Sequence, residues 1–460
     1  MKNNFIRKVK LQGIHKRYNL EIDFSDSLNI LYGQNGTGKS TLIHIIANVA
    51  NCDFIRFAFL EFKRIQVIYS NGAYVSVSQK ESDGEIFVSI ETQAGDFFEF
   101  SKRAAFEDIR EYEDDRFTRE LVPELSGKIA EFVKSSNIKH IDTSYFPAFR
   151  TMLEAWSLQH DNWKMRNTKR TREINTKQST SFARNLFGQF LPSINYPSPI
   201  EIESRLRDEI RDCQIRIARY ESSVFSDSFV KVFSALLEGS IVDSSAHELL
   251  FEISQLTEES NADKFGDVEE NSNTYRQLQR LVNQGNIESL GSSASGALTV
   301  YRDALKERRS FRMEAFKEID TYFDVVNSFL DKKELAYHAI NESRRVPKVG
   351  LKFPDDSWSS IKVMSSGERQ LLTMLYAVNR MSGNSAVLID EPEISLHIDW
   401  QEDLLKKMME QLGDRQIIVC THSPAIAADF DEYMKEVKPM FSDLKTDETS
   451  FLIDEDEDDF

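Results

Sequence analysis

The chain has 460 residues, of which 40% are hydrophobic and 29% are charged, and its formal net charge is −18. This length allows a large buried core and predicts about three domains, whereas the overall acidity excludes a protein that coats DNA through a generally basic surface. Neither a run of about 18 apolar residues nor a signal-peptide pattern occurs, so we expect a cytoplasmic protein with no membrane segment and with reduced cysteines.

The first strands of the chain lead to a phosphate-binding motif. Strand patterns are predicted at residues 5–14, 18–24 and 28–32, and the last of them runs directly into the sequence GQNGTGKST at residues 33–41. This sequence fits the pattern G-x-x-x-x-G-K-[ST]. The helical pattern that begins at Leu42 completes the order of strand, loop and helix that the motif requires. A glycine-rich turn that fits the pattern by chance would not be expected to have this order.

The chemistry of this loop indicates a nucleoside triphosphate bound with a magnesium ion. Glycines let backbone N–H groups turn toward phosphate oxygens, and the following helix directs its positive end at the same anion. We expect Lys39 to reach the β and γ phosphates of ATP and the Ser40 hydroxyl to bind Mg²⁺. The predicted nucleotide-binding residues of the loop are Gly33, Asn35, Gly36, Thr37, Gly38, Lys39, Ser40 and Thr41.

A β meander follows the loop and its helix. Four strand patterns between residues 64 and 100 are separated by dipeptides typical of hairpin turns, namely Asn71-Gly72, Asp83-Gly84 and Gly95-Asp96. We therefore predict an α/β fold in which an antiparallel β subdomain is attached to a parallel sheet. A charged helical region at 101–135 and a strand at 138–145 are predicted next.

Residues 151–345 are predicted to form a mostly helical insertion. Charged amphipathic stretches at 200–238 and 298–335 are separated by breakers. Their apolar positions do not keep a heptad over many turns, so we expect no long antiparallel coiled coil. A polar loop carries five cations that either follow the backbone of DNA or form a solvated surface that pairs with the acidic tail. These cations are Lys164, Arg166, Lys169, Arg170 and Arg172.

Two predicted core strands near the end of the chain are followed by polar groups. The run at 386–389 ends in Asp390-Glu391, and ligands collect at the carboxyl ends of strands in parallel sheets. We expect Asp390 to bind Mg²⁺ and Glu391 to polarise the attacking water. The run at 416–420 precedes His422, which we interpret as a sensor of the γ-phosphate.

The order of these motifs resembles that of soluble ABC-type ATPases of the RecF, SMC and overcoming-lysogenization families. The sequence MSSGERQ at 364–370 is similar to their signature, 390–397 to their acidic motif, 399–401 to their D-loop, and 421–424 to their switch histidine. The resemblance implies an ABC-type P-loop ATPase head that binds ATP and Mg²⁺. The domain limits predicted on this basis are two ATPase lobes at 1–150 and 346–440, the insertion at 151–345 and an acidic tail at 441–460.

The resemblance also implies an assembly. In these families two ATP molecules are held between two subunits arranged head to tail, and the signature of one subunit meets the γ-phosphate bound by the other. Here that contact would come from Ser365, Ser366 and Gly367, which precede an amphipathic helix. A head-to-tail homodimer or a higher homo-oligomer is therefore expected, with hydrolysis by Glu391 and His422 releasing it.

Among the soluble relatives, the chain looks most like the PtuA family, the ATPase subunits of Septu anti-phage defence, which are also found with some retrons. The features that carry this resemblance are the S-S-G-E-R-Q form of the signature, the segment at 146–150 and the medium-sized helical insert. It implies a partner HNH endonuclease, PtuB, that cuts DNA under control of the ATPase. No C-terminal Toprim pattern occurs, so no nuclease activity is expected in the chain itself. The alternative is a RecF-type repair or recombination ATPase without a nuclease partner; a transporter ATPase is disfavoured because the insert is polar.

Three further features leave alternatives open. Tyr18 either packs in a strand, which is favoured, or stacks on adenine. Arg150 either contacts the nucleotide, couples the insertion to the site, or forms a structural salt bridge, which is favoured. Residues 441–460 hold nine acids against one lysine and so carry −8 of the total charge. This tail either keeps the protein soluble or docks on a basic partner surface or in the DNA path.

Overall fold

The computed structural model describes residues 4–113, 124–153, 169–238, 248–249, 251–256, 292–338, 348–380, 385–411 and 415–441. Within these ranges, no helix has the length and apolarity needed to cross a membrane. Of the five predicted cations, Lys164 and Arg166 lie outside the described residues, as does the acidic tail from residue 442. Lys169, Arg170 and Arg172 begin helix α5 (Lys169–Phe187), so the loop predicted for them is wrong.

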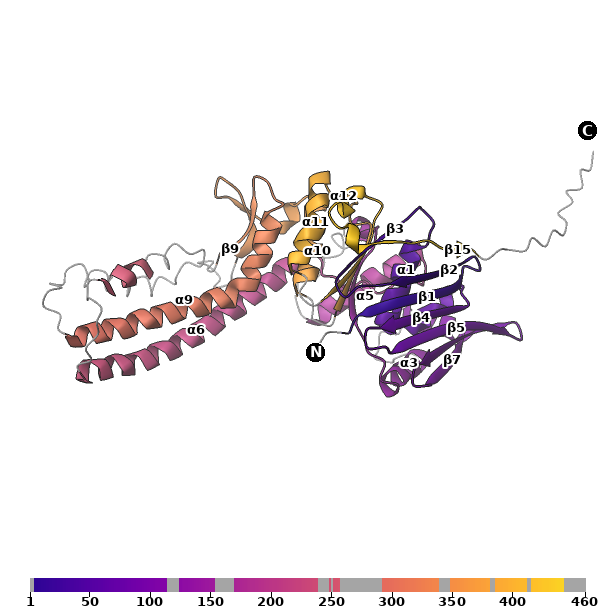
Figure 1. Cartoon of the computed structure of the whole chain (residues 1–460), viewed down its shortest axis with the longest axis horizontal. Coiled ribbons are helices and arrows are strands. Elements are labelled where there is room, and N and C mark those ends of the chain that lie inside the picture. Colours follow the sequence, from indigo (N-terminus) through magenta and orange to yellow (C-terminus); the bar gives the residue numbers. More distant parts are fainter. Residues whose placement is uncertain are drawn as a thin grey trace, which may run out of the picture.

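An antiparallel sheet forms one side of the molecule (Figure 1). Its seven strands lie in the order β15-β2-β1-β4-β5-β6-β7. In β1, Val9 and Leu11 are buried while Lys8 and Lys10, which alternate with them, reach Glu21 on the neighbouring strand. This is the period of two expected of a sheet with one covered face. The strands are β1 (Ile6–Ile14), β2 (Tyr18–Asp23), β4 (Arg64–Tyr69), β5 (Tyr74–Ser82), β6 (Glu85–Thr92), β7 (Phe97–Ser101) and β15 (Met440–Phe441).

A parallel sheet of five strands carries the motifs found in the sequence. Its order is β14-β3-β13-β12-β8, and every neighbouring pair is parallel. The strands are β3 (Leu28–Tyr32), β8 (Asp142–Phe146), β12 (Ser385–Asp390), β13 (Gln416–Cys420) and β14 (Met434–Glu436). The predicted combination of a parallel sheet with an antiparallel β subdomain is therefore confirmed.

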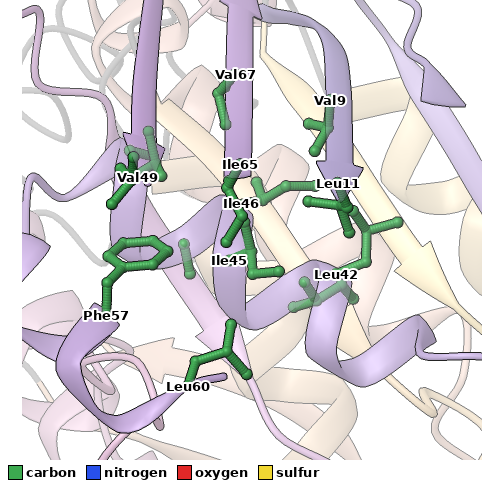
Figure 2. Packing of buried hydrophobic residues seen from close by; sticks show 14 of the residues in the cluster. Val9, Leu11, Leu42, Ile45, Ile46, Val49, Phe57, Leu60, Ile65 and Val67 are labelled. Atoms are coloured by element: carbon green, nitrogen blue, oxygen red, sulfur yellow. The ribbon is translucent and has the colours of Figure 1, made fainter. Parts of the chain in front are cut away.

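Alternate residues of the parallel sheet face two separate hydrophobic cores. Leu388 and Ile418 belong to the first core, which also contains α1 (Lys39–Ala50) and the antiparallel sheet. Figure 2 shows this packing, with Leu42, Ile45, Ile46 and Val49 of α1 meeting side chains of β1 and β4. Ile389 and Val419 belong to the second core, which contains α10 (Ser366–Arg380) and α11 (Ile398–Gln411). The helix after the phosphate loop and the helix after the signature thus cover opposite faces of one sheet.

The helical insertion projects from the second core as a long hairpin (Figure 1). Its arms are α6 (Pro199–Glu238) and α9 (Ser292–Asn327), so the helix predicted over 298–335 ends early, and strand β9 (Glu334–His338) follows it. The smaller elements are η1 (Phe54–Phe59), α2 (Lys102–Glu113), α3 (Glu124–Ser135), β10 (Lys348–Lys352), β11 (Trp358–Ser359), η5 (Ile361–Val363), α12 (Pro424–Ala427) and η6 (Asp431–Tyr433).

No long antiparallel coiled coil is expected from the sequence, whereas the structure pairs the two long helices α6 and α9. Near the base, α6 contributes buried side chains three or four residues apart, at 202, 206, 210, 213 and 217. Farther out the arms are joined by polar contacts, including the hydrogen bond from Tyr220 to Glu307 and the ion pair of Arg308 with Glu221. Nearer the base, Cys213 donates to the Ala315 carbonyl, so the partners on α9 move from 315 to 307 as the residues on α6 move from 213 to 220, which makes the pair antiparallel. The spaced apolar positions therefore mark the base of the hairpin, and polar pairs together with the stacked rings of Tyr220 and Phe311 continue it.

His44 makes folding sensitive to acid. Its Nε2 lies 2.7 Å from the Tyr145 hydroxyl, and burial lowers the pKa of His44 to about 4 from 6.5. The unfolded chain therefore binds a proton at a higher pH than the folded chain does, so the free energy of unfolding should fall as pH drops from 6.5 toward about 4, by at most about 3 kcal/mol, and His44 should contribute no slope above 6.5. Urea unfolding over this range checks the slope. His44→Gln should remove this contribution, and an unchanged slope in that variant would refute the assignment.

Candidate nucleotide site

The phosphate loop joins β3 to α1 in a conformation that its glycines permit. Gly36 and Gly38 have φ angles of 80° and 89°, in the left-handed region, and α1 begins at the next residue. The Nζ of Lys39 donates hydrogen bonds to the carbonyl oxygens of Gly33 at 2.8 Å and Gln34 at 3.0 Å. Burial lowers the pKa of Lys39, an effect that nearby carboxylates oppose. The lysine is thus folded over the loop at the helix N-terminus, where a phosphate would bind.

Three neighbouring strands bring the predicted site residues together. The phosphate loop follows β3, His422 follows β13, and Asp390 ends β12, and these strands pair in register with Leu31 opposite Cys420 and Cys420 opposite Asp390. All three loops therefore leave the same carboxyl edge of the parallel sheet, the edge at which such sheets bind ligands.

Asp390 and Ser40 form the pair suited to magnesium. Asp390 is 5% exposed. Burial, assisted by the charge of Glu391, raises the pKa of Asp390 to about 6, while the Ser40 hydroxyl, Arg150 and Lys39 act against the rise. A hydroxyl and a carboxylate beside a phosphate loop supply two of the oxygen ligands that Mg²⁺ prefers, and the rest come from phosphate oxygens and water. The residues thus fit the ion, which would neutralise phosphate charge there.

Glu391 and His422 are positioned differently from one another. Glu391 is partly buried and has a left-handed φ of 51°, and its N–H donates to the Cys420 carbonyl at 2.9 Å. His422 has an exposed side chain at the end of the neighbouring strand. The proposed base thus lies in a strained turn between the two strand ends, and the proposed sensor lies beside it. The roles given to both residues stay predictions.

Glu393 is a site residue that the sequence analysis did not single out. Its carboxylate accepts three hydrogen bonds from the switch segment, defined here as residues 421–423: from the Thr421 hydroxyl at 3.0 Å, the His422 N–H at 2.7 Å and the Ser423 N–H at 3.1 Å. Glu393 lies two residues after Glu391, and nothing in the sequence tells which of the two carboxylates is the general base and which one supports the switch segment. The fold makes the distinction, because only Glu393 is engaged by the switch segment.

Glu393→Gln tests this support. The amide oxygen can still accept from the His422 and Ser423 N–H groups, but the negative charge is lost and the amide NH2 group faces the Thr421 hydroxyl, which can no longer donate there. Hydrogen bonds to a charged group contribute about 1.5–3 kcal/mol. We expect a lower kcat with nearly unchanged ATP affinity, because the phosphate loop is untouched. Steady-state kinetics should show that adding His422→Ala to this variant has little further effect. Full additivity of the two changes would contradict a shared role.

Arg150 is almost fully buried and makes no salt bridge among the described residues. Its guanidinium instead donates to main-chain carbonyls of the acidic loop, defined here as residues 390–395, and to Gln370 of the signature helix. The predicted salt bridge is therefore wrong. Apart from the Gln370 side chain, its partners are main-chain carbonyls, which carry no sequence signal.

Tyr18 serves as packing next to the phosphate loop. It is 5% exposed, and a Cβ placed on Gly38 would overlap its hydroxyl oxygen. Its ring and that of Phe441 of β15 are arranged edge to face, with the ring centroids 6.3 Å apart. A buried ring offers no face to adenine, so the structure favours the packing interpretation of Tyr18.

The signature begins α10 with a closed hydrogen-bond pattern. The Ser365 N–H donates to the Glu368 carboxylate at 2.7 Å, and the Glu368 N–H donates to the Ser365 hydroxyl at 3.3 Å, which is a capping box. Lys333 pairs with the same carboxylate at 2.9 Å. Ser365 and Ser366 are exposed and Gly367 is buried, where a Cβ would overlap the Ser395 carbonyl. Their contact with a partner's nucleotide stays a prediction.

Comparison with known proteins was made at the level of family, sequence relatives and solved structures. A family model described as an AAA ATPase domain matches residues 5–427. The retron Ec83 probable ATPase of Escherichia coli is 30% identical over 84 residues, which cover 16% of each chain. The retron Vc95 probable ATPase of Vibrio cholerae serotype O1 biovar El Tor is 25% identical over 168 residues, covering 33% of this chain and 31% of the relative. These matches span less than a third of either relative.

The solved structures that match this chain are distant from it. The Smc head domain of Pyrococcus furiosus, with an extended coiled coil and bound to the C-terminal domain of ScpA, is 15% identical with a TM-score of 0.37, and the match covers 93% of this chain and 92% of the other. An SmcHead bound to the C-winged helix domain of ScpA is 12% identical with a TM-score of 0.38, covering 95% and 98%.

The family model spans the phosphate loop, the signature, the acidic loop and the switch segment. The prediction of an ATPase is confirmed by this match. The chain belongs to the AAA ATPase domain family.

Proposed function

We propose that this ATPase binds Mg-ATP between two copies of the chain arranged head to tail, and that hydrolysis separates them. The observation that carries the proposal is the placement of α1 and α10 on opposite faces of one sheet. The phosphate loop begins one helix, and the exposed serines of the signature begin the other. A second copy can bring its signature to the nucleotide that this copy holds.

The energetics favour a nucleotide-dependent dimer over a permanent one. A single helix N-terminus stabilises an anion by only about 0.3–1 kcal/mol, so an empty signature is a weak anion site. When two copies close over two triphosphates, each triphosphate gains a second helix N-terminus. A ligand that binds the closed state better than the open one shifts the equilibrium toward closure, and loss of the γ-phosphate reverses the shift.

Within each site the residues divide the work. Lys39 and the loop amides hold the phosphates, and Ser40 with Asp390 holds Mg²⁺. Glu391 takes the proton of the attacking water, while Glu393 keeps His422 beside the γ-phosphate. Ser365, Ser366 and Gly367 of the other copy complete the anion site.

The biological role that we propose is control of a partner nuclease in anti-phage defence. Two partial relatives are named as retron ATPases, and the signature and the 146–150 segment resemble the PtuA family of Septu defence. The partner would be an HNH endonuclease of the PtuB type, restrained or released by the nucleotide state of the dimer.

Co-expression with an HNH endonuclease encoded beside the gene tests this role. We expect the two proteins to purify together, the pair to reduce phage plaque formation, and Lys39→Ala to abolish the protection. Protection that persists in Lys39→Ala would contradict nucleotide control. DNA binding and repair phenotypes without any nuclease partner would instead favour a repair ATPase.

A further inference from the structure

The guanidinium of Arg150 joins the signature helix to the acidic loop. Its Nε donates to Gln370 Oε1 at 3.1 Å, one turn after the signature. Its two terminal nitrogens donate to the carbonyls of Asp390 at 3.1 Å and of Glu391 and Pro392 at 3.0 Å each. Longer bonds reach the carbonyls of Pro147 at 3.2 Å and Ile394 at 3.3 Å. One buried cation therefore holds most of the loop that carries the proposed base.

The acidic loop needs such an external support. Glu391 and Ser395 both have left-handed φ angles, 51° and 68°, which cost roughly 1–3 kcal/mol each for residues other than glycine. Apart from Arg150, the main-chain contact of Glu391 across the sheet is the bond from its N–H to Cys420. The carbonyls that converge on Arg150 fix the turn from its inner side, so a shift of the guanidinium would shift Glu391.

The first turns of helix α10 are linked to both ends of the acidic loop. Gln370 contacts its first half through Arg150, and Gly367 lies so close to the Ser395 carbonyl that a Cβ there would overlap it. The start of the helix is in turn tied to the region after α9 by the ion pair of Lys333 with Glu368. A movement of the signature can therefore move the acidic loop in two ways, directly at Ser395 and through Arg150.

We propose that Arg150 is a positioning residue that transmits the state of the signature to Glu391 of the same chain. The signature meets the nucleotide held by the other copy, whereas Glu391 acts on the nucleotide held by its own copy. Closure at one ATP would then set the catalytic geometry at the second ATP, and the two hydrolysis events would be cooperative. This inference rests on the dimer proposed above.

The test uses Arg150→Lys and Gln370→Met in the full chain. Lysine keeps the charge but cannot donate to Gln370 and four carbonyls together. Methionine removes the Oε1 acceptor together with the buried Nε2 group, which has no hydrogen-bond partner among the described residues. For Arg150→Lys we expect kcat to fall on the order of 10–100-fold, as for a catalytic group that is slightly misplaced. Binding of a fluorescent ATP analogue should change less than about twofold, because the phosphate loop keeps its contacts.

Gln370→Met removes only the link between Arg150 and the signature helix, because the bonds from Arg150 to the carbonyls of the acidic loop remain. We expect a Hill coefficient for ATP hydrolysis above one in the wild type and near one in this variant, with ATP-dependent dimerisation retained. The double variant should be no slower than Arg150→Lys alone. Arg184→Lys is the matched control, since Arg184 is also buried but bonds to Asp53 and Leu191, away from the site. It should lower the Tm without changing kcat.

The outcomes separate the inference from the dimer proposal. If the wild type dimerises with ATP but Gln370→Met keeps the wild-type Hill coefficient, the transmission through Arg150 is refuted and the dimer stands. The same holds if Arg150→Lys lowers the Tm as Arg184→Lys does and leaves kcat unchanged. If the wild type stays monomeric at saturating ATP, both proposals fall. Should Arg150→Lys not fold, the Gln370→Met measurement still decides the question.

Discussion

Glu391→Gln is expected to bind ATP, to stop hydrolysing it and to accumulate as an ATP-bound dimer. The amide has the same shape as the carboxylate but cannot accept the proton of the attacking water, and loss of a general base costs about 10²–10⁴-fold in rate. The main chain at this residue is held by Cys420 and Arg150, which do not involve its side chain. The fold and the phosphate contacts should therefore survive the change.

Phosphate release and mass measurement with and without ATP check this prediction together. Glu402→Gln is the control, because it makes the same change at an exposed position on α11 and should behave as the wild type in both measurements. Turnover by Glu391→Gln at the wild-type rate would contradict its assignment as the base. A slow variant that stays monomeric with ATP bound would support Glu391 as the base but contradict the prediction that the ATP-bound dimer accumulates.

Gly38→Ala is expected to abolish nucleotide binding, whereas Gly36→Ala should only weaken it. Both glycines have left-handed φ angles, so alanine is strained at either position by roughly 1–2 kcal/mol, a factor of about 5–30. The surroundings differ. A Cβ at Gly36 would meet no atom within 4 Å, but a Cβ at Gly38 would overlap the hydroxyl of the buried Tyr18. Alanine at 38 must therefore displace the helix start or the tyrosine.

Titration with a fluorescent ATP analogue measures the difference between the two variants. Circular dichroism and the Tm should show that both remain folded, since the loop lies at the edge of the core. Equal affinities for the two variants would show that the Tyr18 contact does not restrict the loop. Such a result would contradict the geometry described for the site.

The parts of the site that could be predicted from the sequence are those whose chemistry is local. The phosphate loop and His422 follow short buried strands and Asp390 ends another, and a parallel sheet brings the ends of such strands to one edge. Their approximate positions therefore follow from pattern and topology alone.

The parts that could not be predicted depend on contacts between distant segments. Arg150 binds carbonyls some 240 residues later in the chain, and a carbonyl is present at every position. Glu393 and Glu391 are alike in sequence and are separated only by the fold, which turns one toward the switch segment. Strand β15 is defined by its pairing with β2, and its two residues are too few to show the alternation of buried and exposed side chains by which a strand is predicted. The pairing of α6 with α9 was not predicted because its outer contacts combine polar pairs with the stacked rings of Tyr220 and Phe311, which leave no sustained apolar heptad.

The central claim is that each nucleotide is held by two copies, one supplying the phosphate loop and the other the signature. Mixing two inactive variants tests it most directly: Lys39→Ala, which lacks the phosphate contact, and Ser366→Arg, which places a bulky side chain on the exposed start of α10. Their heterodimer retains one intact composite site, so we predict that the mixture hydrolyses ATP although neither variant does alone. A mixture as inactive as its components, or a Ser366→Arg variant that hydrolyses ATP by itself as a monomer, would contradict the account.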